Sequence, residues 1–142
     1  MITLLPQIVQ GLGDTFASRN DTYQETIVKE SYKSLPKGAY PRVVVQEITN
    51  SEVLDRSTRE GEQTTLLSYQ ITVYTRDTEE FDYVDSARFM ASIVDDYMMQ
   101  EYKMQRVGDM VIQPYISDNT VMTCTQRYTC VYDKETNLIY KN

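Results

Sequence analysis

The sequence predicts an α+β fold: a mainly antiparallel sheet of about four strands, in two hairpins, with two to three helices packed on one face. Two observations predict this class. Apolar residues recur every three or four positions in some segments, as in helices, and every second position in others, as in strands. These segments follow one another as helix, hairpin, helix, hairpin, an order that favours antiparallel pairing. The length of 142 residues suits one domain, which we assign to residues 1–142.

An amphipathic helix is predicted over residues 2–18. Its apolar stripe consists of Leu4, Leu5, Ile8, Val9, Leu12 and Phe16. Pro6 falls in the first turn, where a missing N–H costs no hydrogen bond. In residues 23–35 the apolar spacing suggests a second short helix or a bent continuation, whereas Thr26 and Ile27 are also typical of strands. Both interpretations stay open for that segment.

A long hairpin is predicted next, because the hydrophobic period changes to two. Its strands are residues 42–48, with an extension toward Leu54, and residues 64–75. The polar residues 55–63 connect them. A strand of about 12 residues reaches about 40 Å, whereas a globule of this length has a radius of gyration of about 14–15 Å. We therefore expect the tip of the hairpin to project beyond the core.

The second helix is the most regular element that the sequence predicts. It opens in an acidic segment, where Asp77 and Glu80 have the spacing of a capping box, and it continues for about 20 residues. Its apolar stripe consists of Val84, Ala87, Ala91, Val94 and Met98. The small residues in this stripe predict a close approach of the helix to the sheet.

The last hairpin carries both cysteines. Its strands are residues 104–116, broken by a glycine and placed at a sheet edge by Pro114, and residues 121–132. Cys124 and Cys130 lie on the same face of the second strand, about 20 Å apart. A disulfide requires Cα atoms within about 7 Å. We therefore expect two free cysteines that serve as small apolar residues.

Charge and composition exclude several classes of function. The net charge of -7 is opposite in sign to the basic surface that nucleic-acid binding needs. Histidine, the commonest general base and zinc ligand, is absent, and the sequence contains no phosphate-binding or nucleophile-elbow motif. It has no apolar run of the ~20 residues that a bilayer span needs, and its first residues do not resemble a secretory signal. We expect a cytoplasmic protein that is not an enzyme and binds no metal or cofactor.

Two groups of residues have more than one interpretation. The acidic run of residues 77–85 offers carboxylates for a hard cation, but it lacks the ligand spacing of an EF-hand. We interpret it as a solvated helix start, with a metal-dependent enzyme as a remote alternative. The 12 tyrosines suit cross-strand pairs, a protein interface or, against the net charge, base stacking. The residues concerned are Tyr69, Tyr74, Tyr128 and Tyr132, with Met98, Met99, Met104 and Met110 near them in sequence.

Several segments, taken together, resemble a known family. They are residues 40–48 (YPRVVVQEI), 61–62 (GE), 67–77 (LSYQITVYTRD), 87–97 (ARFMASIVDDY), 113–114 (QP) and 127–132 (RYTCVY). In these segments the chain resembles the tail completion, or tail terminator, proteins of long-tailed, siphovirus-type bacteriophages. The resemblance spans residues 40–133. Its motifs are structural, and none is catalytic.

The resemblance implies a small α+β subunit that assembles as a homo-hexameric ring on the last ring of the major tail tube protein. There it would stop tube polymerisation and offer a docking face to the head-completion protein. DNA would pass through the lumen without sequence-specific binding. The resemblance also implies a place in the tail or neck of the virion, after assembly in the bacterial cytoplasm. A closed ring requires two different, complementary patches on every subunit.

The hairpin tip is our candidate for partner binding. We expect it to make a ring or tube contact through Arg56, Arg59, Glu60 and Glu62. The competing hypothesis for these residues is an exposed loop without a partner. Two other functions stay open for the whole chain: another neck or connector (head-completion) protein, and a monomeric acidic protein-binding module.

Overall fold

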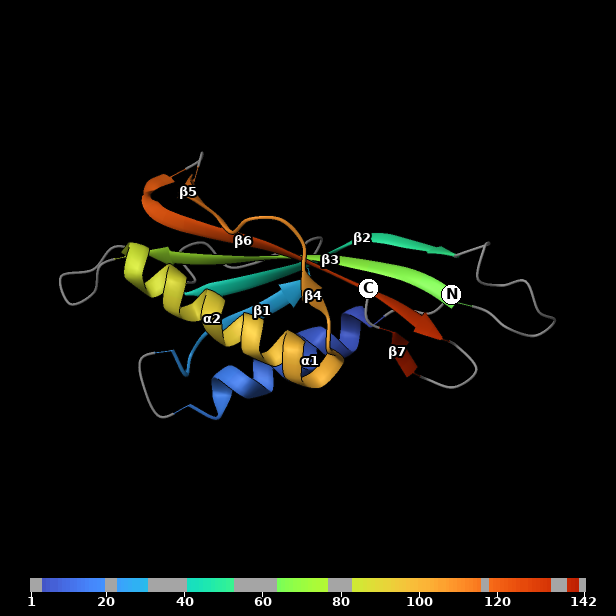
Figure 1. Cartoon of the computed structure of the whole chain (residues 1–142). Coiled ribbons are helices and arrows are strands. Elements are labelled where there is room, and N and C mark those ends of the chain that lie inside the picture. The colour runs from blue at the N-terminus through green and yellow to red at the C-terminus, as the bar shows by residue number, and fades with distance from the viewer. Residues whose placement is uncertain are drawn as a thin grey trace.

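The fold has two layers. A computed structural model describes residues 4–19, 23–30, 41–52, 64–76, 83–115, 118–133 and 138–140. In this part of the chain two helices pack on a mixed, mostly antiparallel sheet, which confirms the predicted α+β class. Figure 1 shows both helices on the same side of the sheet. The elements are α1 (Leu5–Ala17), β1 (Ile27–Glu30), β2 (Arg42–Glu52), β3 (Thr64–Arg76), α2 (Tyr83–Tyr102), β4 (Gln105–Arg106), β5 (Val111–Tyr115), β6 (Asp118–Asp133) and β7 (Leu138–Tyr140).

The described sheet has seven strands in the order β1-β2-β3-β6-β4, with β5 and β7 also paired to β6. The predicted hairpin of β2 and β3 is present, with Arg42 opposite Tyr74 at one end and Glu52 opposite Thr65 at the other. Strand β3 occupies one edge of β6 through the pairs that run from Thr64–Asp133 to Arg76–Val121. Because that edge is filled, β4, β5 and β7 share the opposite edge of β6.

The sheet has more strands than the four that the sequence predicts. The predicted strand over residues 104–116 is split into β4 and β5 by a bend at Gly108, whose φ is +76°. Residues 27–30 form β1, parallel to β2, so a helix over residues 23–35 is wrong there. Val28 is buried and Lys29 exposed, which is the alternation of a strand. Because the segment is very short, the sequence did not distinguish this alternation from helical spacing. Strand β7 was not expected.

Both predicted helices are present. Helix α1 has a proline in its first turn and buries four residues of the predicted stripe, namely Leu5, Ile8, Leu12 and Phe16. Helix α2 is 20 residues long and buries Ala87, Met90, Ala91, Val94 and Met98. The predicted cap residues Asp77 and Glu80 lie outside the described part of the chain.

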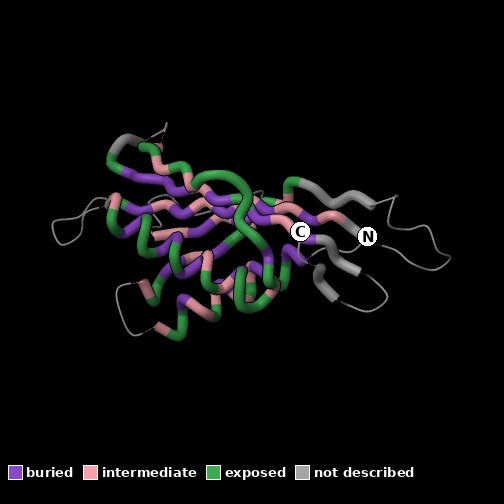
Figure 2. The backbone as a smooth tube through the Cα atoms, viewed as in Figure 1, coloured by how far each residue is buried: buried purple, intermediate pink, exposed green. Residues whose placement is uncertain are grey.

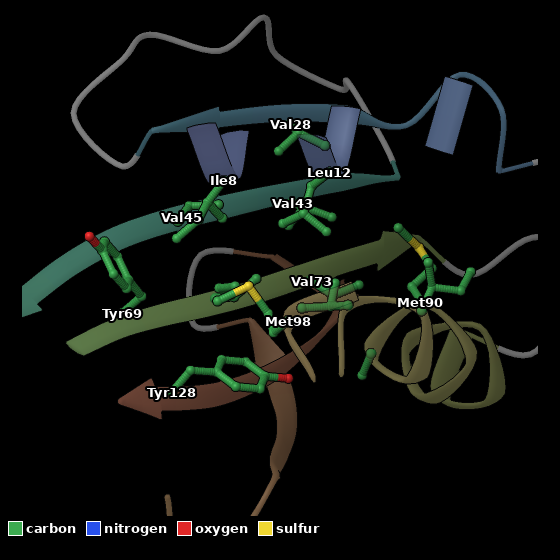
Figure 3. Close-up of a cluster of buried hydrophobic side chains, with 14 of the residues drawn as sticks. Ile8, Leu12, Val28, Val43, Val45, Tyr69, Val73, Met90, Met98 and Tyr128 are labelled. Atoms are coloured by element: carbon green, nitrogen blue, oxygen red, sulfur yellow. The ribbon is translucent and has the colours of Figure 1, made fainter. Parts of the chain in front are cut away.

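The core fills the space between the helices and the sheet. Figure 3 shows Ile8 and Leu12 of α1 next to Val43 and Val45 of β2, and Met98 of α2 on the side of β3 and β6. In Figure 2 the buried residues alternate along the strands and line the inner side of the helices. Alternation on β3 is as predicted, with Leu67, Tyr69, Ile71 and Val73 buried.

The helices meet at one close contact. A Cβ placed on Gly11 of α1 would overlap the hydroxyl of Tyr97 on α2 and lie 2.6 Å from its Cζ. The Tyr97 hydroxyl is 3.3 Å from that of Tyr102, and the two rings meet edge to face at 5.7 Å. A Cβ placed on Gly13 of the same helix would have no neighbouring atom within 4 Å. Glycine at position 11 therefore sets how closely α1 approaches α2.

Candidate functional site

The predicted contact residues cannot be placed. Arg56, Arg59, Glu60 and Glu62 lie outside the described residues, so the hypothesis of a partner-binding tip stays a prediction. The strands that lead to the tip are described. Strand β3 has 13 residues, a length of about 43 Å, whereas the 20 residues of α2 span about 30 Å. Figure 1 shows the ends of β2 and β3 nearest the tip extending past both helices.

The side of the sheet opposite the helices, which we call the open face, is the first of two candidate surfaces. Strand alternation and register give its members. They include the uncharged polar residues Gln46, Ser68, Gln70, Thr72, Gln113, Thr125 and Thr129, the apolar residues Ile27, Val44, Ile48, Leu66 and Val111, the aromatic residues Tyr74 and Tyr115, and the basic residues Lys29, Arg42, Arg76 and Arg127. Among the described side chains of these strands, none on this face is acidic.

Cross-strand hydrogen bonds order the open face. They join Ser68 Oγ to Thr129 Oγ1 (3.2 Å), Thr72 Oγ1 to Thr125 Oγ1 (3.3 Å), and Arg127 Nε, as donor, to Gln70 Oε1 (3.1 Å). Each bond joins residues that are direct register partners of β3 and β6. The guanidinium of Arg42 lies 4.6 Å from the ring centre of Tyr74. These contacts hold the polar side chains in fixed positions. Arg127 nevertheless stays exposed, so it remains accessible to a partner.

A shallow hollow of about 510 Å³ lies at one side of the open face, where the chain bends between β4 and β5. Its lining includes Arg127 and Gln70 from the face itself and Asp109 and Val107 from the bend. The hollow is open to solvent and combines one cation, one anion and amides. The Thr125 hydroxyl, which also lines the hollow, is hydrogen-bonded to Thr72 Oγ1 (3.3 Å).

The helical layer is the second candidate surface, and its charge is opposite. Helices α1 and α2 carry five carboxylates, Asp14, Asp85, Asp95, Asp96 and Glu101, against one cation, Arg88. Arg19 and Lys103 follow the two helices, where they complement the negative ends of the helix dipoles. The guanidinium of Arg19 lies 5.1 Å from the ring centre of Phe89 on α2, and the Tyr23 ring lies 5.1 Å from the same ring. We call the outer side of α2, with exposed Asp85, Phe89, Asp96 and Met99, the helix face. The net charge of -7 therefore conceals a basic open face and a helical layer in which five carboxylates outnumber three cations.

The cysteines do not form a site. Cys124 and Cys130 are both buried and free, as predicted. Burial raises the pKa of the Cys124 thiol to about 11, although the nearby guanidinium groups of Arg106 and Arg88 act in the opposite direction. Burial alone raises the pKa of the Cys130 thiol to about 12. Both thiols therefore stay protonated and unreactive near neutral pH.

A buried polar network joins α2, β4 and β6. The Tyr128 hydroxyl donates a hydrogen bond to Asp95 Oδ1 (3.1 Å) and lies 3.0 Å from the side-chain amide of Gln126. A hydroxyl has one proton, so the amide nitrogen of Gln126 faces it as a donor and also donates to the Ala91 carbonyl (3.2 Å), while the amide oxygen accepts from Arg106 Nη1 (3.2 Å). Burial and the neighbouring Asp95 carboxylate raise the pKa of Tyr128. The hydroxyl of Tyr128 and the side-chain amide of Gln126 thus both have hydrogen-bond partners, as in a network that stabilises the fold.

The tyrosines and methionines divide between core and surface. Tyr69 and Tyr128 are buried register partners on β3 and β6, which confirms cross-strand pairing for these two. Tyr74 meets Tyr115 edge to face at 5.3 Å, although their strands β3 and β5 are not neighbours in the sheet. Tyr132 has no described side chain. Met98 and Met104 are fully buried, so a surface role for them is wrong, whereas Met99 is 48% exposed and Met110 half-buried. The sequence analysis did not predict the two charged faces. Strand alternation could have indicated one of them, because it places Arg76 and Arg127 on the face of the sheet that the buried residues do not use.

In the described part of the chain, no three histidine, cysteine or carboxylate side chains gather closely enough to hold a metal ion. Neither described helix combines the length and the apolar character of a membrane-spanning segment. Comparison of the chain with models of known protein families gave no match, and comparison with curated proteins gave none.

Proposed function

We propose that this chain is a tail terminator (tail completion) protein of a long-tailed, siphovirus-type bacteriophage. In this role it is a structural subunit, not an enzyme. It forms a homo-hexameric ring at the head-proximal end of the tail tube, stops polymerisation of the major tail tube protein and offers a docking face for the head-completion protein. The proposal starts from the resemblance over residues 40–133.

One observation supports it most. Strands β2 and β3 continue past the helical layer, so the segment between them, residues 53–63, is connected to the end of the sheet that extends beyond both helices, where Thr64 of β3 still pairs with Asp133 of β6. A subunit that must reach a neighbouring ring needs such an extension. The open face and the helix face supply, in addition, the two different patches that a closed ring requires.

The first test is the native mass of the protein over a concentration series, with and without Mg²⁺. We expect a closed species of about 99 kDa, six times the 16.5 kDa of the chain. A ring of twelve would contradict the proposal and favour a connector. A protein that remains monomeric and does not cap isolated tail tubes would also contradict it, and would favour the monomeric binding module.

The hairpin tip needs its own test. Replacing residues 56–63 by a short Gly-Asn turn should abolish capping of tail tubes in vitro while leaving the far-ultraviolet circular dichroism spectrum unchanged. The matched control is a full-length variant with alanine at four positions, Arg56, Arg59, Glu60 and Glu62. If the control loses capping too, the charged side chains make the contact. Unchanged capping by the shortened protein would rule out a role for the tip.

A further inference from the structure

The two candidate surfaces match each other in charge. The open face carries Lys29 and Arg127 as exposed cations, and the helix face carries Asp85 and Asp96 as exposed anions. The helices lie on one side of the sheet, so the two surfaces belong to opposite sides of the molecule (Figure 1). The open face of one copy cannot contact the helix face of the same copy, whereas it can contact the helix face of a second copy.

The surfaces also match in apolar character. On the open face, Ile48 and Val111 are 44% and 48% exposed, and on the helix face Phe89 and Met99 are 42% and 48% exposed. Side chains of this size gain free energy when they leave water, by about 25 cal/mol for each Å² of apolar area that is buried. Each surface therefore combines apolar area with a charge of predominantly one sign: cations prevail on the strands of the open face, and carboxylates outnumber cations over the helical layer as a whole, although Arg19 and Arg88 lie beside the helix face.

We infer that the open face of one copy packs against the helix face of the next copy. This inference rests on the proposed function, for which it specifies the contact that builds the ring. Opposite charges bring the faces together, and the apolar side chains bury area once they meet. Arg127 is the best placed cation, because its Nε is held by Gln70 and its terminal nitrogens remain as donors.

A contact between two different faces has a structural consequence. Each copy uses its open face toward one neighbour and its helix face toward the other, so the contact repeats and every copy is equivalent. Such a head-to-tail contact closes into a ring when each step turns by one sixth of a circle, and otherwise continues as a filament. Closure in turn means that a weakened contact is weakened six times in every hexamer.

The other occupant to consider is duplex DNA, because the open face is basic. The observations favour a second copy. The molecule as a whole has a net charge of -7, which repels a polyanion at long range, and exposed Ile48 and Val111 have no role against phosphates. DNA is therefore included below as an outcome that would overturn the inference.

Two charge reversals and their mixture test the contact. Arg127→Glu makes the open face more acidic, and Asp96→Lys makes the helix face more basic. Each variant alone should self-associate about tenfold more weakly than the original protein, because like charges meet at the contact. Mixed in equal amounts, the two should recover assembly as alternating rings with three copies of each, a composition that native mass spectrometry resolves.

The controls separate charge from other effects. Arg127→Lys and Asp96→Glu keep the charge and should assemble normally, and Glu25→Lys reverses an exposed charge outside both faces and should do the same. If rings form but both reversals leave them intact, or if the mixture does not recover, the contact lies elsewhere and the proposed function is unaffected. If the original protein stays monomeric, the inference fails, and capping of tail tubes then decides the function separately. Loss of duplex DNA binding in Arg127→Glu, with association unchanged, would assign the face to DNA.

Discussion

Buried hydroxyl groups connect the layers of this protein at single residues. The Tyr69 hydroxyl accepts a hydrogen bond from the backbone N–H of Leu4 (2.9 Å) and donates one to Glu47 Oε1 (3.0 Å), so it links the residue before α1 to β2 and β3. Tyr128 links β6 to α2 in a similar way, through Asp95. Strand alternation predicts that both tyrosines face the core. It does not predict their partners, because these come from elements far away in sequence.

We predict that Tyr128→Phe lowers the free energy of unfolding by about 1–3 kcal/mol, since it leaves Asp95 and the Gln126 amide with one partner fewer in a buried site. Urea denaturation followed by circular dichroism measures the change. Tyr115→Phe, at a half-buried position, should change stability by less than half as much. Equal losses in the two variants would show that the Tyr128 network contributes little.

At the scale of elements, the helix pair depends on a position without a side chain. Gly11 lies against Tyr97, whereas Gly13 of the same helix has open space around it. The sequence indicates only that both glycines weaken α1. The distinction between them requires the position of α2, which residue periodicity cannot supply.

We predict opposite effects for two alanine substitutions in α1. Gly11→Ala should lower the free energy of unfolding by about 1–3 kcal/mol, because the new Cβ forces the Tyr97 ring to move. Gly13→Ala should raise it by up to about 1 kcal/mol, because alanine favours helix and meets nothing there. Thermal and urea unfolding of both variants check this. A gain of stability in Gly11→Ala would contradict the close helix contact.

The strands show which elements can be predicted from sequence and which cannot. Strands β2, β3 and β6 are long and alternate over many residues, so their approximate positions and the β2–β3 pairing were predictable. Strand β1 has four residues, too few for a period of two to be distinguished from helical spacing. Strands β4, β5 and β7 exist because the free edge of β6 stabilises short segments, and that edge is a tertiary feature.

For the whole molecule, stability should fall in alkaline solution. The pKa values of the Cys124 and Cys130 thiols are raised to about 11 and about 12, and burial also raises the pKa values of Tyr97, Tyr102 and Tyr128. Near and below pH 8 these groups are protonated in both states. Above the thiol pKa of the unfolded chain, about 8.5, the unfolded state loses protons first, so the free energy of unfolding decreases with pH.

We therefore predict a urea midpoint that is constant from pH 7 to about pH 8 and declines between about pH 9 and pH 12. The double variant Cys124→Ala, Cys130→Ala should have a smaller slope near pH 9–10, where unfolded thiols titrate before most tyrosines. Its stability at neutral pH is lower because of the lost volume, so the slope is the informative quantity. An identical slope in both proteins would mean that the thiols do not contribute.

The candidate surfaces also belong to the scale of the whole molecule. Composition gives the net charge, but the separation of basic and acidic faces depends on which side of the sheet the helices cover. Strand alternation already placed Arg127 and Tyr128 on opposite faces of the sheet. The sequence also predicts helices on one face only, which the structure confirms. The separation of charge was missed because the side of the sheet on which Arg127 lies was not compared with the side that the helices cover.

The arrangement at the outer edge of β6 affects how the protein behaves when it is concentrated. A strand of 16 residues with an exposed edge would be a template for fibrillar aggregation. Here three short strands, β4, β5 and β7, pair with that edge and cover it. One of them contains Pro114, which has no N–H to donate to a further strand. The other end of the described sheet is β1, with only four residues and the charged side chains of Lys29 and Glu30. The fold therefore disfavours fibrillar aggregation through its sheet edges. Association of copies is then expected through the open face and the helix face.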